Sequence, residues 1–182
     1  MQGAAVSTAG YGERTGLERV FLEHQARVFR AAYRITGNAH DAEDVLQTVF
    51  LRLARQGEAS ALDLDNPSSY LYRSAINSAL DLLRARRGRA SVPLEDAAGA
   101  AGERPGPYEA QEAVEIRRWL REALAALPPR AAEMFALRYL EGQPNRDIAR
   151  MLGVSRVTVA VTLHRTRQRL QDQLGQWRRG RR

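Results

Sequence analysis

The residues best suited to binding chemistry gather on one predicted helix near the C-terminus. Between residues 156 and 170 this segment carries Arg156, Arg165, Arg167 and Arg169, with Thr158 and Thr162 among them. Guanidinium groups bind phosphates and guanine edges in DNA, and hydroxyl groups act as versatile short-range partners. A helix that enters the major groove needs such side chains. The pattern therefore favours DNA binding over an ordinary amphipathic helix with a solvated arginine-rich side.

The element that positions these side chains is predicted to be a helix-turn-helix. A short apolar face formed by Ile148, Ala149 and Leu152 ends at Gly153, a residue suited to a left-handed helix cap. Ser155 can then cap the next helix, whose apolar face contains Val159, Leu163, Leu170 and Leu174. Two helices joined by a short turn that contains glycine are typical of this motif.

The charge of the chain is concentrated at the same end. The 182 residues carry a formal net charge of +7, and no lysine is present, so all 28 basic residues counted as Lys+Arg are arginine. Residues 156–182 contain eight arginines against one acid, Asp172, and so hold as much net charge as the whole chain. A basic segment of this kind favours a polyanionic partner.

Several classes of protein are disfavoured by what the sequence lacks. There is no cysteine, no apolar run as long as a membrane span, and no signal-peptide pattern at the N-terminus. His24, His40 and His164 are scattered, and the acids next to His40 suit a helix N-terminus better than a metal site. We therefore expect a cytoplasmic protein that is not an enzyme and that has no metal, no cofactor and no membrane insertion.

The N-terminal half is predicted to form three amphipathic helices around one small core. After a tail at residues 1–16, a helical period begins at Leu17 and closes at Gly37. Asn38 then caps a second helix that reaches about Gln56. Residues 57–66 form a loop, and a third helix begins at Asn66-Pro67. Its inward residues are expected to be Leu71, Ala75, Ala79, Leu82 and Leu83, and it ends in the basic run at residues 84–89.

The C-terminal half is predicted to form a second small domain on a flexible tether. Residues 88–107 are rich in Gly, Ala and Pro without any period, and are expected to be a linker. A helical domain at residues 108–174 follows, and residues 175–182 are expected to be a basic tail. No strand-like alternation occurs, so the predicted fold is all-α with two loosely tethered domains.

Three stretches together resemble the sigma factors of bacterial RNA polymerase, specifically the extracytoplasmic-function group of the sigma-70 family. They are DAEDVLQTVFLRLAR at residues 41–55, SYLYRSAINSALDLLRARR at 69–87, and the helix-turn-helix segment at 126–170. The resemblance covers residues 17–87 and 108–174. It implies a region 2 domain that binds core polymerase and the −10 element, and a region 4 domain that reads the −35 element.

Carried over by position, the resemblance implies polymerase contacts from Asp44, Gln47 and Phe50. A carboxylate and an amide on adjacent turns can meet basic and polar groups of a partner helix, while Phe50 would supply apolar area. The alternatives are a capping acid, a surface glutamine and a core phenylalanine. The polymerase elements implied are the β′ clamp helices and the β flap.

The resemblance also implies contacts near the −10 element. The residues involved are Asn77, Arg84, Arg86, Arg87 and Arg89. Asp81 belongs to the same motif but is expected to make a helix-packing hydrogen bond, and a solvated charge run is the alternative for the arginines. The loop at residues 57–66 occupies the place where the family captures a flipped base, a step that costs a few kcal/mol.

The sequence departs from the family pattern at several positions. Thr48 stands where the family usually has Glu, and Ile76 where it often has Arg. In the recognition helix, residues 160–162 replace the common basic-Ser-Arg triplet, which predicts weak or unusual recognition of the upstream element. The candidate −35 contacts are Arg156, Thr158, Thr162, His164, Arg165 and Arg167.

The resemblance implies a mechanism without covalent chemistry, in which promoter DNA melts because unstacked bases are trapped. Core RNA polymerase and promoter DNA are the expected partners, and an anti-sigma factor is a further expected one. The alternative is a free-standing helix-turn-helix regulator that binds palindromic operators without polymerase. The stretches at residues 41–55 and 69–87 have no assigned role in that alternative.

Overall fold

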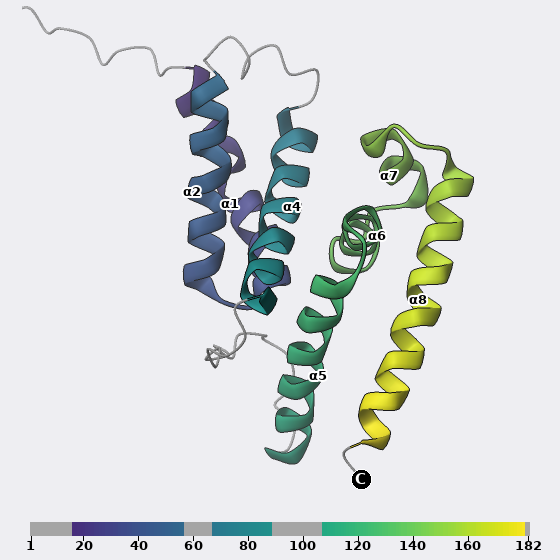
Figure 1. The fold of residues 1–182 in the computed structure, drawn as a ribbon. Coiled ribbons are helices and arrows are strands. Elements are labelled where there is room, and N and C mark those ends of the chain that lie inside the picture. The colour runs from purple at the N-terminus through teal and green to yellow at the C-terminus, as the bar shows by residue number, and fades with distance from the viewer. Residues whose placement is uncertain (1–15, 57–66, 89–106, 181–182) are drawn as a thin grey trace, which may run out of the picture.

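The computed structural model describes residues 16–56, 67–88 and 107–180. All regular structure in these ranges is helical, which confirms the all-α prediction (Figure 1). The proposed base-capturing loop, most of the N-terminal tail, most of the linker and Arg89 lie outside the described residues. Within the described ranges, no helix combines the length and apolarity needed to cross a bilayer.

The first domain is a three-helix bundle of α1 (Gly16–Thr36), α2 (Ala39–Gln56) and α4 (Pro67–Gly88). Gly37 ends α1 with a φ of 70°, a left-handed conformation that glycine adopts without strain. Asn38 accepts a hydrogen bond on its side-chain oxygen from the backbone N–H of Asp41, at 3.1 Å. Both predicted caps are therefore confirmed, and they set the sharp turn between α1 and α2.

Asp41 does more than face the positive end of a helix dipole. Its side chain is only 2% exposed, and both carboxylate oxygens accept hydrogen bonds from the guanidinium group of Arg86 at the end of α4. This bidentate pair fastens α4 to the start of α2 across the bundle. A contact between Arg86 and DNA stays a prediction.

The two partners of this pair should differ in how much stability they contribute. Arg86→Ala leaves a buried carboxylate unpaired, so we expect a loss of about 3–5 kcal/mol in the free energy of unfolding. Asp41→Asn removes the charge and leaves Arg86, which is 40% exposed, free to be hydrated, so the loss should be smaller. Urea unfolding followed by circular dichroism measures both variants. Equal losses would contradict the asymmetry.

The second domain contains α5 (Pro107–Ala126), α6 (Pro129–Phe135), a π-helical turn η1 (Ala136–Leu140), α7 (Asn145–Leu152) and α8 (Arg156–Arg179). The prediction of a basic tail from residue 175 is wrong, because α8 continues to Arg179. Two contacts explain this continuation. The ring of Trp177 lies 6.4 Å from that of Trp119 on α5, and Arg178 lies 3.6 Å from Glu112.

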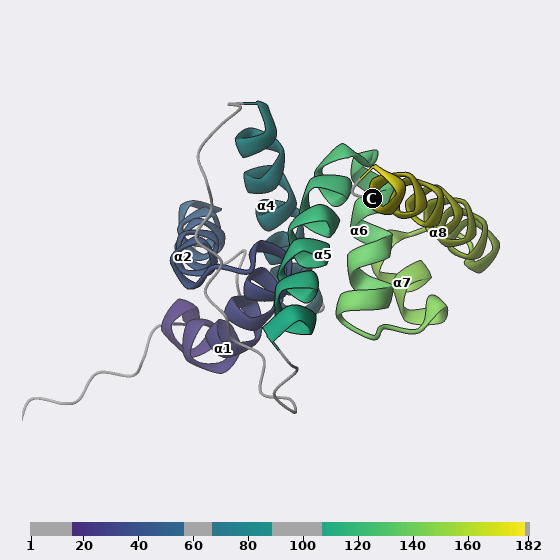
Figure 2. The same ribbon diagram turned by 90° about the horizontal axis from the view of Figure 1, so that it is seen from below.

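The two domains pack against each other instead of standing apart on a loose tether. Helix α4 lies between α1 and α2 on one side and α5 and α6 on the other (Figures 1 and 2). Buried residues of both domains belong to one continuous hydrophobic core. Of the predicted inward residues of α4, Leu82 is half-buried and the others are buried. Tyr72, Ile76 and Leu80 are buried in addition to them. The unusual Ile76 is thus an apolar core residue of the central helix.

Candidate functional site

The helix-turn-helix has the local geometry that its sequence predicts. Gly153 caps α7 in the left-handed conformation, with φ 63° and ψ 37°. Ser155 caps α8, and its hydroxyl oxygen accepts a hydrogen bond from the backbone N–H of Thr158 at 3.0 Å. The buried residues Val159 and Leu163 hold α8 against the rest of the domain. Its opposite side is thereby presented to solvent.

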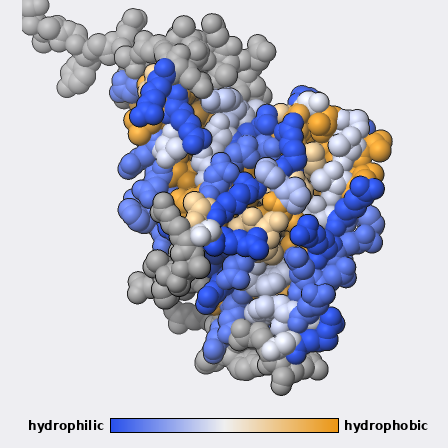
Figure 3. Space-filling model, in the orientation of Figure 1, coloured by the Kyte–Doolittle hydropathy of each residue, from blue (hydrophilic) through white to orange (hydrophobic). Residues whose placement is uncertain are grey.

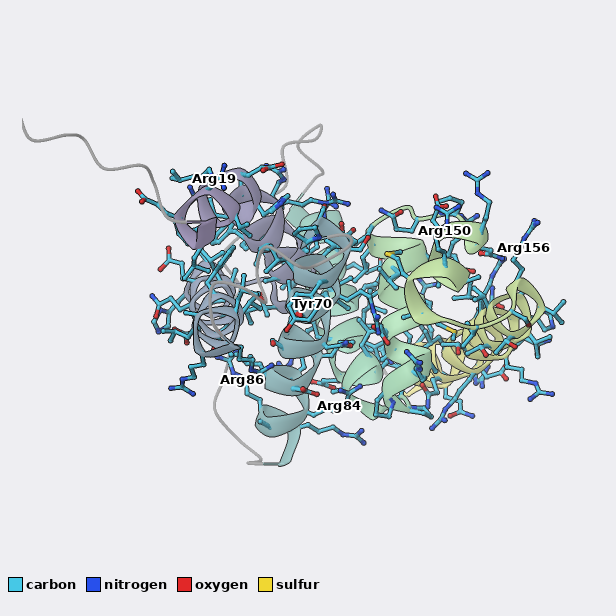
Figure 4. All side chains as sticks on the ribbon, turned by 90° about the horizontal axis from the view of Figure 1, so that it is seen from above. Arg19, Tyr70, Arg84, Arg86, Arg150 and Arg156 are labelled. Carbon is cyan, nitrogen blue, oxygen red and sulfur yellow. The ribbon has the colours of Figure 1, made fainter. Side chains whose placement is uncertain are left out.

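Most of the predicted base-reading residues lie on that solvent-facing side. Arg156, Thr158, His164, Arg165 and Arg167 are exposed, whereas Thr162 is half-buried. The hydroxyl of Thr158 lies 2.9 Å from that of Ser155, so it also takes part in the cap. Figure 4 shows Arg156 at the outer end of α8, on the side of the molecule away from α1 and α2. The exposed face could enter a DNA groove without any change in the domain.

Two exposed apolar residues share this face. Val157 is 71% exposed and Val161 is 43% exposed, and they lie one turn apart on α8. Hydrophobic surface is visible beside hydrophilic surface over the N-terminal part of α8 (Figure 3). In the sequence alone, Val161 stands out only as part of a departure from the family pattern, and no role is predicted for Val157. Their exposure shows that neither side chain is needed for the core.

Glu133, a buried acid of the second domain, contacts α4 at Asn77, one of the residues predicted to lie near the −10 element. Glu133 is 5% exposed and accepts hydrogen bonds from the Nε of Arg73 at 3.0 Å and the Nδ2 of Asn77 at 3.1 Å. Arg130 of its own helix adds a third donor at 3.3 Å. The guanidinium group of Arg73 also donates to the backbone carbonyl of Met151 at 2.7 Å. In this arrangement Asn77 is bound to the second domain.

A second buried acid, Glu141, joins the domains at the end of the π-helical turn. The turn is closed by a hydrogen bond from the N–H of Glu141 to the carbonyl of Ala136, at 3.1 Å. The carboxylate accepts hydrogen bonds from Arg34 at 2.7 Å and from the hydroxyl of Tyr72. Burial, and then the hydrogen bond to Glu141, raise the pKa of Tyr72 well above its usual value, so the tyrosine stays a neutral donor.

Sequence reasoning missed Glu133 and Glu141. The one available signal is that Glu133 lies within an apolar stretch, between Ala132 and Met134, where a charged residue is unexpected. Their partners could not be predicted, since Arg73 and Asn77 are 60 and 56 residues from Glu133 in the sequence.

The arginines at the end of α4 are only partly free. Arg84 donates to Asp81 at 2.8 Å within the helix, and Asp81 is exposed. The prediction of a helix-packing hydrogen bond for Asp81 is therefore wrong. Arg86 points toward α2 and Arg84 toward α5, whereas Arg87 is exposed (Figure 4). The end of α4 remains a basic surface, but two of its guanidinium groups also have partners within the protein.

Two of the three residues predicted to contact polymerase from α2 are exposed to solvent. Asp44 and Gln47 are exposed, but Phe50 is buried and its ring packs edge-to-face on Phe21 at 4.8 Å. The structure thus favours the core alternative for Phe50. The next residue, Leu51, is 57% exposed and lies one turn beyond Gln47. Leu51 is thus an exposed apolar residue on the same side of α2 as Asp44 and Gln47.

Comparison with known proteins finds a family match in each of the two helical domains. Residues 20–89 match the model of the family described as Sigma-70 region 2, and residues 117–170 match Sigma-70, region 4. The extracytoplasmic-function RNA polymerase sigma factor SigM of Mycobacterium tuberculosis is 31% identical over 90% of this chain and 80% of its own length. The chain belongs to the sigma-70 family. It is an extracytoplasmic-function sigma factor, and it is not an enzyme.

Other sigma factors of the same group are similar to this one over most of its length. SigL of Mycobacterium tuberculosis is 32% identical over 88% of this chain and 90% of its own length. SigE of Mycolicibacterium smegmatis is a longer protein, and it is 35% identical over 86% of this chain. The aligned segment covers 61% of the length of SigE. The solved structure of CnrH in complex with the cytosolic domain of CnrY covers 90% of both chains with a TM-score of 0.55 and 21% identity. That likeness supports the same overall fold.

Proposed function

We propose that this sigma factor divides promoter recognition between its two domains. The first domain binds core RNA polymerase through α2 and the −10 element through α4, and the second domain reads the −35 element through α8. Promoter DNA melts because unstacked bases are trapped, so the chain performs no hydrolysis. This division follows the order of the matched regions, with region 2 at residues 20–89 and region 4 at 117–170.

The observation that carries the proposal is the exposed basic face of α8. Ser155 and Gly153 fix the angle of this helix, and Arg156, Arg165 and Arg167 are exposed on it. In helix-turn-helix proteins the N-terminal residues of the second helix contact base edges in the major groove. Guanidinium groups along the same helix then neutralise phosphates.

The exposed face of α2 is the proposed site for the β′ clamp helices of core polymerase. Asp44 and Gln47 provide polar contacts, and Leu51 provides an apolar centre. An apolar residue within a polar rim is the usual composition of a protein interface. The second domain would meet the β flap.

An anti-sigma factor is proposed as a further partner, acting in the cytoplasm. CnrH, which shares the fold, is described in complex with the cytosolic domain of CnrY. The packed arrangement of the two domains offers such a partner one continuous body to bind. The chain's own buried acids, Glu133 and Glu141, already hold this arrangement.

The experiment that tests the proposed function is run-off transcription with core polymerase on a genomic promoter library. Addition of this sigma factor is expected to give promoter-specific transcripts, and their sequences would define both elements. A free-standing regulator would instead bind a palindromic operator without polymerase and give no transcripts. That result would reject the proposal.

A further inference from the structure

The recognition helix exposes an apolar pair where a DNA-reading surface would be expected to be polar. Val157 and Val161 are four positions apart, so they lie on one face of α8, and the small side chain of Ala160 lies exposed beside them. Both valines are opposite the buried Val159 and Leu163. Core packing therefore requires neither side chain, and both are open to contact a partner.

The surroundings of the pair fit nucleic acid. Arg156 precedes it, and His164 and Arg165 follow on the next turn, all exposed. Cationic side chains at both ends of an apolar centre match a major groove, where phosphates line the edges and base edges form the floor. The pair also lies in the first two turns of α8, the part of a recognition helix that meets bases.

Only one group on the floor of the major groove is apolar, and it is the 5-methyl group of thymine. A valine pressed against a cytosine amino group or a guanine oxygen would leave that polar group without a hydrogen bond, at a cost in affinity. We propose that Val157 and Val161 are specificity-determining residues that contact thymine methyl groups in the upstream promoter element. This rests on the proposed function, in which α8 reads that element.

The proposal accounts for Val161, the middle residue of the departure at residues 160–162. Val161 occupies the centre of the triplet in which the family usually carries polar and basic residues, and its side chain is exposed. Replacement of a hydrogen-bonding centre by an apolar one changes which base edge is favoured. The basic positions of the triplet are lost as well, at Ala160 and Thr162, and the exposed cations that remain near the pair are Arg156 and Arg165. The expected outcome is an upstream element with thymine on one strand at one or two positions that face the pair.

The test uses the full chain bound to core polymerase. Promoters are first selected from a library randomised in the upstream element. Each thymine of the enriched element is then replaced by deoxyuridine, which removes only the methyl group. We expect holoenzyme affinity to fall about fourfold at one or two positions, the effect of one methyl-sized group. Val161→Ala or Val157→Ala should abolish the difference between thymine and deoxyuridine at those positions.

One control variant and four possible outcomes test the proposal. Leu22→Ala removes an exposed apolar side chain from α1 and should leave the thymine preference intact. The proposal is overturned if the enriched element has no thymine on either strand, or if deoxyuridine is neutral everywhere, as expected for a protein-docking patch. It is also overturned if the preference survives in both valine variants. Failure to enrich any upstream element would reject the proposed function itself, and this proposal with it.

Discussion

Alanine in place of Glu133 is expected to separate the two domains while each keeps its helices. The carboxylate is almost completely buried and accepts hydrogen bonds from Arg73 and Asn77 of the first domain. Its removal deletes both of these hydrogen bonds between the domains, and a hydrogen bond to a charged group contributes about 1.5–3 kcal/mol. Because 1.4 kcal/mol is a factor of ten, the ratio of closed to open molecules should fall by at least about a hundredfold.

The distance between the domains can be measured directly, because the chain contains no cysteine. Fluorophores attached at Glu43→Cys on α2 and Gln168→Cys on α8, both exposed positions, report the separation by energy transfer. Glu133→Ala should lower the transfer efficiency and raise the radius of gyration. Arg73→Ala should act in the same direction from the first domain, without touching the acid.

Glu122→Ala is the matched control, since this acid of α5 is exposed and pairs only with Arg118 on its own helix among the contacts described. It should leave the energy transfer unchanged. If Glu133→Ala and Arg73→Ala keep both normal helix content and normal transfer, the buried acid does not hold the domains together. Apolar packing of α4 against α5 and α6 would then suffice.

The hydrogen bond between Asn77 of α4 and Glu133 affects how α4 can contact DNA. Asn77 is proposed to meet the −10 element, yet its amide donates to Glu133 in the packed arrangement. The N–H that Glu133 holds is not open to DNA, while the amide keeps a second N–H and its carbonyl oxygen. A DNA contact through the bound N–H therefore requires the two domains to move apart at this point, and the strength of the Glu133 interactions sets part of the free energy required.

The features that the sequence predicted correctly are those with local causes. Gly37, Asn38, Gly153 and Ser155 each act on backbone groups within a few residues, so composition and spacing suffice to place them. The two sigma-70 regions were also identifiable, because their motifs are continuous stretches of the sequence. The end of α8 was misplaced because its cause is the distant packing of Trp177 on Trp119.

The packing of the domains could not be predicted for a physical reason. Helical periodicity finds one apolar face, but α4 is buried on adjacent faces by helices from both domains. The extra buried residues Tyr72, Ile76 and Leu80 look like ordinary variation within an amphipathic helix. Glu141, which accepts the hydrogen bond of the Tyr72 hydroxyl, lies beyond the linker, and a glycine-rich linker gives no signal for how its two ends are arranged.

On α2, the sequence alone also did not show which apolar residue points outward. Val49, Phe50 and Leu51 are three consecutive apolar residues, and a helix turns 100° per residue, so they cannot all face one core. Which of them points outward depends on the neighbouring helix. Phe21 of α1 packs on Phe50, and this contact leaves Leu51 in solvent.

Glutamate in place of Leu51 is therefore expected to abolish most of the affinity for core polymerase without unfolding the domain. A leucine that becomes buried contributes about 1.5–3 kcal/mol, and an unpaired carboxylate in its place adds a further penalty. Together these predict binding that is weaker by about a hundredfold or more. Because Leu51 is 57% exposed in the structure described here, its replacement should leave the unfolding curve almost unchanged.

Competition of unlabelled variants against labelled wild-type sigma factor for core polymerase measures the affinity. Leu22→Glu on α1 is the matched control, an exposed leucine outside the proposed face, and it should compete like the wild type. Phe50→Ala should behave oppositely to Leu51→Glu: removal of a buried ring should cost about 3–5 kcal/mol of folding stability. Full affinity in Leu51→Glu, with loss in Leu22→Glu, would move the polymerase surface from α2 to α1.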